Sequence, residues 1–578
     1  GSDDRGLYLA VELVQGVSLA RLMKTIFDTG EAFTERMVVF ILRQICRGLE
    51  KAHALKSPAG EPLNLVHRDL TPGNILCSFQ GDVKIADFGL VRAVAEGKGD
   101  ALPETVLAML QARISRLEPG ARRVLRGASL FGKTFWRDGV RALYGAGRAT
   151  EDLDRWLDVL LTGEIIAQHP DSRFPGEPEY SFRHLLMRDA AYSLLPETDR
   201  SLGHRLVALY LERRGETDAM VLAEHLRHSD DRHSAIPYYI RAAEQSYAGN
   251  DSEGVLARAA KAEECGVHGE ELGRLRTLQF LAYFWRAEWP YAFPRGLEAL
   301  TLLPAGSFWW CTAMSHLFVI AANTNQTDKL QEQLSLFASV QPAADAHAPY
   351  ITAASVLVTM FSLLGSRHQA CTFLESLRRV AASLGELDDT TRGFFNQGQA
   401  WYMRILLPEP FLACSLAQQC VEAFQKTDDV RNLLNCQILL GMAQKELGEL
   451  AASAATLQSS LELAERQGEP FMVATAKLYL ASFLSDQPAP EQLERAQHLA
   501  GAMLELNLSP SYTGFAHSVL SQILLQKGEP QAAVEHARTA VTMLAMMRPY
   551  QIVACINLSR ALLALGQVTA ARAAAEEG

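Results

Sequence analysis

The C-terminal part of the sequence repeats a pattern of helix, glycine and second helix, and this repetition restricts the possible fold more than any other feature. Gly448, Gly528 and Gly566 each end an apolar helical segment, and an Ala-rich segment follows each of them. Asp486-Gln487 lies midway between the first two glycines. The period is therefore about 40 residues, which corresponds to one helix pair per repeat. Because one helix pair cannot bury its apolar face alone, we expect residues 201–578 to stack into an α-solenoid.

Small residues on the second helices allow the paired helices to approach closely, as at Ala532-Ala533 and Ala570-Ala571. This pattern resembles degenerate tetratricopeptide repeats, and the resemblance implies protein or peptide partners. An aromatic cluster, Phe284-Trp285, Trp289 and Trp309-Trp310, falls in the same region. It can form a peptide-binding surface or the core of the repeats, and we favour the core because large aromatic residues are more often used in this way.

Composition excludes some classes of partner. The net charge is −11, and no region is basic enough to favour nucleic acid or an anionic membrane surface. Two uncharged segments, residues 307–327 and 347–366, are interrupted by polar residues, so we expect buried helices rather than membrane spans. The nine cysteines form no CxxC pair, which is typical of reduced thiols in a cytoplasmic protein.

A predicted β-hairpin in residues 65–92 carries polar residues at its base. Two short apolar runs flank the turn Gln80-Gly81-Asp82. His67-Arg68-Asp69 comes before the first run, which begins at Asn74, and Asp87-Phe88-Gly89 follows the second. Because a hairpin brings its ends together, we expect Asn74 and Asp87 to face one cavity, with Asp69 at its edge.

These residue types suit phosphoryl transfer, which depends on positioning and charge neutralisation. Asn74 and Asp87 offer hard oxygen ligands for Mg²⁺, and Asp69 can accept the proton of a hydroxyl group. The series HRDxxxxN followed by DFG resembles the catalytic core of a eukaryotic-type protein kinase. This resemblance implies a bacterial serine/threonine kinase that uses ATP and Mg²⁺. It makes Asp69 the base, Arg68 a partner of an activation segment, and the other two residues the metal ligands.

The segments before the hairpin extend the resemblance. Residues 7–14 predict an apolar strand, Ser18 is placed as the N-cap of a following helix, and residues 34–55 predict an amphipathic helix. By the match these are the last small-lobe strand with the hinge, and two helices of the large lobe. We therefore expect a kinase segment in the order hinge, helices, catalytic loop and hairpin.

The resemblance also implies a nucleotide site. The backbone of Glu12 and Val14 would face the adenine edge, and Leu76 would form the adenine floor. Thr71 stands two residues after the catalytic aspartate, where serine/threonine kinases usually carry a lysine that helps to hold the transferred phosphate. We therefore place Thr71 beside the phosphates.

The resemblance covers about one third of a kinase domain, and we predict a partial kinase domain over residues 1–94 and a junction over residues 95–104. No glycine-rich loop or VAIK-type lysine precedes residue 7, and no activation segment is recognisable after Gly89. The sequence begins with Gly1 rather than Met, which is typical of a fragment or a cloning scar. Because phosphate anchoring is then incomplete, we expect the chain alone to have little or no kinase activity.

Residues 105–200 predict a compact, mainly helical domain. We expect helices over residues 103–117, 119–131, 152–162 and 180–195, and a small β-wing from Glu164. The series is similar to the winged-helix part of bacterial signal-transduction ATPases, which lies between an ATPase module and a helical repeat array. Gly127–Thr134 matches the phosphate-binding pattern GxxxxGK[ST], but its first glycine lies near the end of the helix predicted over residues 119–131. We interpret it as a turn that ends this helix, with Gly132 in the left-handed conformation.

The expected fold is mainly α: a truncated large-lobe kinase fragment (α+β), a winged-helix-like domain and an α-solenoid. Two functions remain open. The chain can be a serine/threonine kinase of bacterial signalling with a repeat-type sensor or interaction region. Alternatively, it is a non-catalytic repeat scaffold with a vestigial kinase segment. The completeness of the phosphate-binding machinery distinguishes the two hypotheses.

Overall fold

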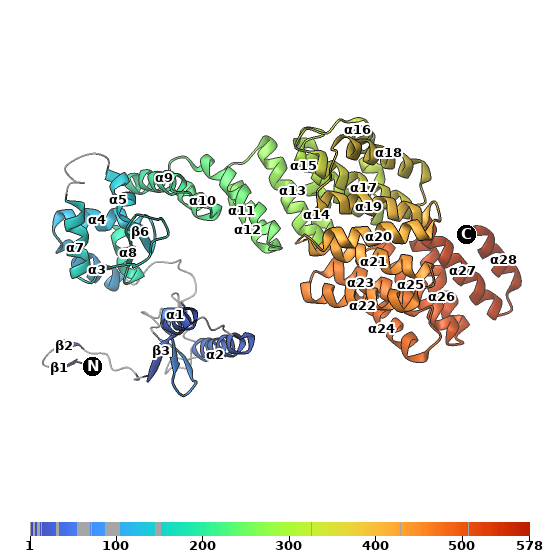
Figure 1. Cartoon of the computed structure of the whole chain (residues 1–578), viewed down its shortest axis with the longest axis horizontal. Coiled ribbons are helices and arrows are strands. Elements are labelled where there is room, and N and C mark those ends of the chain that lie inside the picture. Colours follow the sequence, from blue (N-terminus) through green and yellow to red (C-terminus); the bar gives the residue numbers. More distant parts are fainter. Residues whose placement is uncertain are drawn as a thin grey trace. The chain divides into compact units, whose positions relative to one another are not determined.

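The computed structural model is mainly α-helical (Figure 1). It describes residues 2–3, 6–7, 12, 14–29, 34–54, 70, 72–86, 104–144, 152–324, 326–427, 429–506 and 508–578. The chain divides into two compact units, residues 1–110 and residues 111–578. Each unit contains its own cluster of buried apolar residues.

The first unit contains a three-stranded antiparallel sheet with strand order β3–β4–β5. Its strands are β3 (Gly16–Ser18), β4 (Ile75–Ser78) and β5 (Val83–Ile85). Gly81 turns the hairpin with a φ of 92°, a conformation that glycine adopts without strain. The predicted hairpin is therefore confirmed. Two short strands, β1 (Ser2–Asp3) and β2 (Gly6–Leu7), pair with each other.

Two helices cover one face of this sheet: α1 (Leu19–Thr29) and α2 (Glu35–His53). The expected cap is present, because Ser18 Oγ accepts the N–H of Arg21 at 3.3 Å. The second helix is capped as well: Thr34 Oγ1 accepts the N–H of Met37 at 3.3 Å. The shared core is small and consists of Leu19, Ile41, Ile45 and Ile75, with partly buried neighbours.

The strand expected over residues 7–14 is corrected in its described part. Glu12 and Val14 lie outside regular strands, and residues 8–11 and 13 lie outside the described residues. The hairpin instead pairs with β3, in which Gly16 is the partner of Ser78. A Cβ atom on Gly16 would lie 2.0 Å from the carbonyl oxygen of Cys77, so this close pairing requires glycine.

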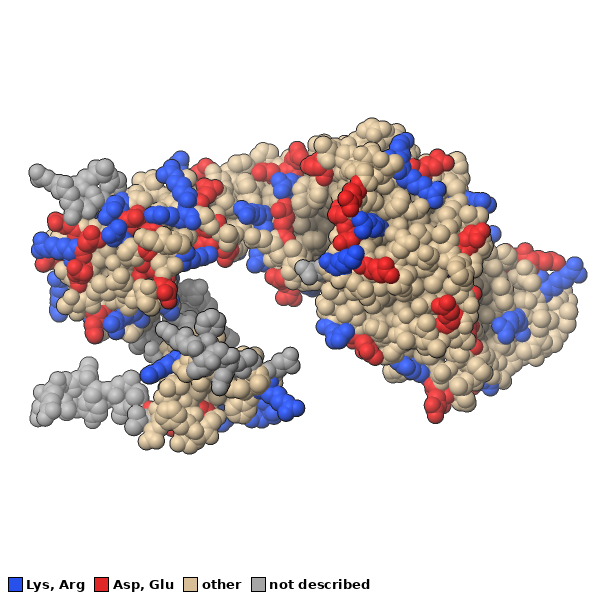
Figure 2. Space-filling view, in the orientation of Figure 1, with Lys and Arg blue, Asp and Glu red and all other residues tan. Residues whose placement is uncertain are grey.

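The second unit begins with a helical region that contains a small sheet. Its helices are α3 (Glu104–Ser115, which begins in the first unit), α4 (Pro119–Ser129), α5 (Arg137–Tyr144), α7 (Leu153–Thr162) and α8 (Leu185–Ser193). The strands β6 (Thr134–Trp136), β7 (Ile166–Gln168) and β8 (Glu179–Phe182) form an antiparallel sheet of order β6–β8–β7. On the face shown in Figure 2, basic and acidic residues alternate over this region, and neither sign forms an extended patch.

The helix expected over residues 180–195 is wrong in its first part. Tyr180 and Phe182 belong to β8, the central strand of the sheet, and the helix begins at Leu185. The ring of Phe135 on β6 lies 5.6 Å from both aromatic rings. The strand is favoured because β8 pairs with β6 on one edge and with β7 on the other, and because these rings are buried. A short sequence window around residue 180 does not contain both partner strands.

The stretch Gly127–Thr134 has the reverse order of a phosphate-binding loop. The helix α4 ends at Ser129, Gly132 has a φ of 107°, and β6 follows. A phosphate-binding loop follows a strand and opens a helix, so that helix N–H groups point at the anion. The interpretation as a turn after a helix is confirmed.

Residues 197–577 form successive antiparallel helices. They are α9 (Glu197–Arg213), α10 (Ala219–Arg227), α11 (Ile236–Ala248), α12 (Ser252–Glu264), α13 (Gly269–Trp285), α14 (Trp289–Leu302), α15 (Phe308–Asn323), α16 (Gln331–Ser339), α17 (His347–Leu363), α18 (Arg367–Ser383), α19 (Asp389–Ile405), α20 (Pro410–Phe424), α21 (Val430–Glu446), α22 (Leu450–Gln467), α23 (Pro470–Leu484), α24 (Pro490–Leu506), α25 (Pro510–Gln526), α26 (Pro530–Met543), α27 (Arg548–Ala564) and α28 (Val568–Glu577). Gly448, Gly528 and Gly566 separate paired helices with φ values of 81°, 79° and 73°. The predicted α-solenoid is confirmed.

The solenoid returns on itself. The helices α13, α15 and α17 contact α23, α25 and α27 respectively, in addition to their neighbours in the chain. The uncharged segments form α15 and α17, whose residues are largely buried. Among the described helices, none is long and apolar enough to cross a membrane.

Candidate functional site

The base of the hairpin holds Asn74. It ends a short 3₁₀ turn, Pro72–Asn74, directly before β4, and its side chain is half-buried. The N–H of Ala86 donates a hydrogen bond to the carbonyl of Asn74 at 2.8 Å. This bond sets Asn74 beside the residue that precedes Asp87 in the sequence. The pairing follows from the hairpin register, in which Ile75 is opposite Ile85.

One face of the sheet gathers two of the residues expected at the nucleotide site. Leu76 lies opposite Lys84 across β4 and β5, and residues directly opposite in a ladder share a face. Lys84 forms an ion pair with Glu12, so this side chain reaches the same face as Leu76. Ile75 points to the other face, where it is buried beneath α1 and α2.

The electrostatics of this face depend on the ion pair. The hydrogen bond to Glu12 raises the pKa of Lys84. Both side chains are well exposed, with 40% and 69% of their surface accessible, so solvent screens the interaction. Burial raises the pKa of the Cys77 thiol, so Cys77 is not an activated nucleophile.

The other predicted site residues lie outside the described part of the chain. These residues are Arg68, Asp69, Thr71 and Asp87. Val14 is described and half-buried just before β3. The structure therefore brings Glu12 and Leu76 to one face and sets Asn74 at the hairpin base. Among the described residues, no group of three or more His, Cys, Asp or Glu side chains could hold a metal ion.

Sequence reasoning missed Lys84 and Gly16. Alternation along the hairpin could have placed Lys84 on the face of Leu76, because side chains two residues apart share a face. Its pairing with Glu12 could not be found in this way, because the two residues are far apart in the sequence. The requirement for glycine at position 16 depends on the pairing of β3 with β4, which is a tertiary contact.

Comparison with known families agrees with this local geometry. Residues 2–108 match the protein kinase domain, and residues 552–577 match a tetratricopeptide repeat. The N-terminal segment is therefore similar to a protein kinase domain. The kinase match ends within α3, and the repeat match covers most of α27 and all of α28.

Two curated relatives share the kinase segment. The serine/threonine-protein kinase PknL of Mycobacterium tuberculosis is 46% identical over 95 residues, which are 16% of this chain and 21% of PknL. The tyrosine-protein kinase MasK of Myxococcus xanthus is 34% identical over 86 residues, which are 15% of this chain and 13% of MasK. The chain thus spans about a fifth of PknL and less of MasK. The names of the two relatives specify different acceptor residues, serine or threonine for PknL and tyrosine for MasK.

A solved structure of a signal-transduction ATPase with a tetratricopeptide repeat sensor, from Pyrococcus horikoshii, aligns with a TM-score of 0.36 and 13% identity. The alignment covers 83% of this chain and 66% of that chain. The assignment of the repeats rests on the helix pairs and on the family match at the C-terminus.

Proposed function

We propose that this chain is part of a bacterial serine/threonine protein kinase, which transfers the γ-phosphate of ATP to a protein hydroxyl group. One observation carries the proposal: the 2.8 Å hydrogen bond between Ala86 N–H and the Asn74 carbonyl. It joins the end of HRDxxxxN to the residue before DFG, as a shared metal site requires. The 46% identity to PknL over this segment supports the serine/threonine assignment.

The proposed roles follow from the chemistry of each side chain. Asp69 accepts the proton of the acceptor hydroxyl, and Arg68 pairs with an activation segment. Asn74 and Asp87 supply an amide oxygen and a carboxylate, a donor set that fits Mg²⁺. Bound Mg²⁺ would neutralise charge on the phosphates.

The nucleotide site uses the face of the sheet that carries Leu76. In the proposal Leu76 packs against adenine, the backbone of Glu12 and Val14 faces its polar edge, and Thr71 lies near the phosphates. The half-burial of Leu76 supports this role, because an apolar side chain on the open face of a sheet offers a flat contact surface.

We further propose that residues 105–200 are a winged-helix-like domain, between a kinase segment over residues 1–94 with its junction and the repeats over residues 201–578. The repeats would bind protein or peptide partners. The nine cysteines carry free thiols, which supports a cytoplasmic location.

Nucleotide binding tests the proposal. The 578 residues include no glycine-rich loop or VAIK-type lysine, so we expect weak binding of a fluorescent ATP analogue and little phosphoryl transfer. The binding should require Mg²⁺ and should be lost in Asp87→Ala. The matched control is Asp82→Ala, which removes an exposed carboxylate from the hairpin turn.

Equal binding by the two variants, or binding without Mg²⁺, would refute the metal site. A complete absence of binding in the unmodified chain would favour the alternative, a repeat scaffold whose kinase segment is vestigial. Radiolabelled transfer to a generic protein acceptor, with phosphoamino-acid analysis, distinguishes serine/threonine from tyrosine products.

A further inference from the structure

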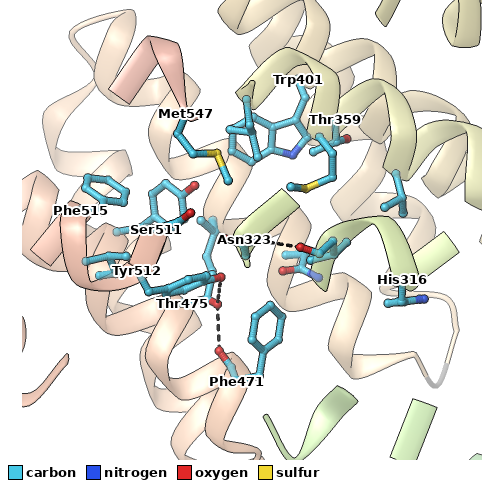
Figure 3. Close-up of a pocket in the computed structure, with 18 of the residues that line it drawn as sticks. His316, Asn323, Thr359, Trp401, Phe471, Thr475, Ser511, Tyr512, Phe515 and Met547 are labelled. Carbon is cyan, nitrogen blue, oxygen red and sulfur yellow. Dashed lines mark hydrogen bonds between the residues drawn. The ribbon is translucent and has the colours of Figure 1, made fainter. Parts of the chain in front are cut away.

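A cavity of about 170 Å³ lies inside the C-terminal helical repeats (Figure 3). Its lining comes almost entirely from alternate helices: α13, α15, α17, α19, α21, α23, α25 and α27. These are the first helices of successive pairs, so the cavity lies on the inner side of the solenoid. The intervening helices cover the outer side, apart from two residues near the end of α26. None of its lining residues belongs to the kinase segment, and the inference does not depend on the proposed function.

The return of the solenoid on itself closes this space. The ring of Phe284 on α13 lies 5.2 Å from that of Phe471 on α23, and the ring of Trp289 lies 6.4 Å from that of Tyr512 on α25. An extended peptide needs an open groove along the inner helices. These cross-solenoid contacts leave a compartment of limited size instead.

The lining is uncharged. None of the described residues that line the cavity is Asp, Glu, Lys or Arg. Burial lowers the pKa of His316 to about 4, so this imidazole is neutral near pH 7. Arg431, which approaches the lining ring of Trp285, is paired with Glu469. A charged molecule would lose its hydration here without gaining a counter-charge.

The lining combines aromatic rings and aliphatic side chains with a few amides. Trp401, Phe471, Tyr512 and Phe515 surround the space in Figure 3, together with the amide of Asn323. Gln397 lies at the cavity wall with 8% of the whole residue accessible, and its amide forms no hydrogen bond within the described part of the chain. An amide that reaches a cavity without a protein partner is free to hydrogen-bond a ligand or a water molecule there.

We propose that this cavity binds a small, neutral, ring-containing molecule that carries an amide-like group able to donate and accept hydrogen bonds. The ring packs among the aromatic side chains, and the polar group meets the amide of Gln397. The size fits, because an apolar cavity of about 150 Å³ accommodates benzene. A ligand in the cavity would contact both sets of inner helices, α13–α17 and α23–α27, and so would link them.

Three probes of nearly equal shape test the charge preference: benzamide, which is neutral, benzoate, an anion, and benzamidine, a cation. Each is titrated into the full chain at pH 7 by calorimetry and by saturation-transfer NMR. We expect saturable, one-to-one binding of benzamide, and at least about tenfold weaker binding of both ions because of their desolvation. Acetamide, which lacks the ring, should not bind.

Two variants locate the binding. Thr359→Trp places an indole into the cavity and should abolish benzamide binding. Thr542→Trp adds the same group at an exposed position on α26 and should leave it unchanged. Gln397→Leu keeps the volume but removes the amide; it should weaken benzamide binding about fivefold or more while toluene binding stays the same.

The proposal is wrong if benzamide shows no saturable binding up to its solubility limit, if either ion binds as tightly, or if both tryptophan variants bind benzamide equally. Circular dichroism checks that Thr359→Trp folds. If it does not fold, the contrast between benzamide and toluene in Gln397→Leu decides the question.

Discussion

The guanidinium carbon of Arg431 on α21 lies 4.6 Å from the ring centre of Trp285 on α13. The same side chain forms an ion pair with Glu469, just before α23, and lies 5.5 Å from the ring centre of Tyr247 on α11. Arg431 therefore connects α11 and α13, in the first repeats, with α21 and the start of α23, in the later ones. Its position explains part of the closure of the solenoid, because one partly buried cation contacts partners on three separate segments.

Replacement of Arg431 by Ala should loosen this contact. The change leaves Glu469 buried without its partner and removes the cation–π contact, so we expect a loss of about 2–3 kcal/mol in unfolding free energy. Urea unfolding followed by tryptophan fluorescence measures the loss. Arg466→Ala, at an exposed position on α22, is the matched control and should shift stability by less than about 0.5 kcal/mol. Equal midpoints for the two variants would contradict the prediction.

Glu177 is a buried carboxylate that accepts two hydrogen bonds and forms an ion pair. Its Oε1 atom accepts the N–H of Asp138 at 2.8 Å and the hydroxyl of Tyr210 at 2.5 Å, and Arg214 lies 2.9 Å from its Oε2 atom. Glu177→Ala leaves these donors without an acceptor, so we expect destabilisation by about 2–4 kcal/mol. Hydrogen exchange in α5 and α9 should accelerate accordingly. The exposed Asp171→Ala should leave exchange in both helices unchanged.

The histidines of α9 and α10 make stability depend on pH. His204 Nδ1 lies 2.9 Å from His225 Nδ1, and its Nε2 lies 2.8 Å from the hydroxyl of Tyr192. Burial lowers the pKa of His204 to about 3 and that of His225 to about 4, with added repulsion from His228. The folded state therefore binds fewer protons than the unfolded state between about pH 6.5 and 4.

The stability of this region should therefore fall as the pH falls through that window. In the unfolded state the pKa of a histidine is near 6.5. Each histidine that stays neutral in the folded state should therefore lower the unfolding free energy by roughly 2 kcal/mol at pH 5 relative to pH 7. Hydrogen exchange of α9 and α10 at the two pH values, corrected for intrinsic rates, measures the change. His204→Gln should reduce the pH dependence, whereas the exposed His233→Gln should preserve it. A pH dependence that is the same in both variants would exclude the cluster as its source.

Gly16 should be essential for the sheet of the kinase segment. A side chain at this position would collide with the Cys77 carbonyl at 2.0 Å, so Gly16→Ala should separate β3 from β4. We expect a loss of about 2–3 kcal/mol in the local opening free energy. Hydrogen exchange of peptides that contain residues 75–78 reports the change. Gln80→Ala, in the exposed turn of the same hairpin, should leave exchange unaltered.

Elements with strong local signals were predictable from the sequence. The turn at Gly81, the caps at Ser18 and Thr34, and the glycines that end the repeat helices all act within a few residues, so a short window contains their cause. Tyr180–Phe182 was misassigned because its strand depends on two partners distant in the chain. At the candidate site, the position of Asn74 followed from the hairpin, whereas the pairing of Glu12 with Lys84 did not.

The sequence by itself determined that helix pairs stack and that a kinase hairpin precedes them, because periodicity, turn residues and the HRD and DFG motifs are local properties. Only the tertiary structure decided that α13 meets α23 and that a cavity lined by uncharged side chains lies between the inner helices of the solenoid. The physical reason is that small rotations between successive repeats accumulate over many helices. The sum of these rotations decides which distant helices come into contact. The sequence of a single repeat does not contain this information.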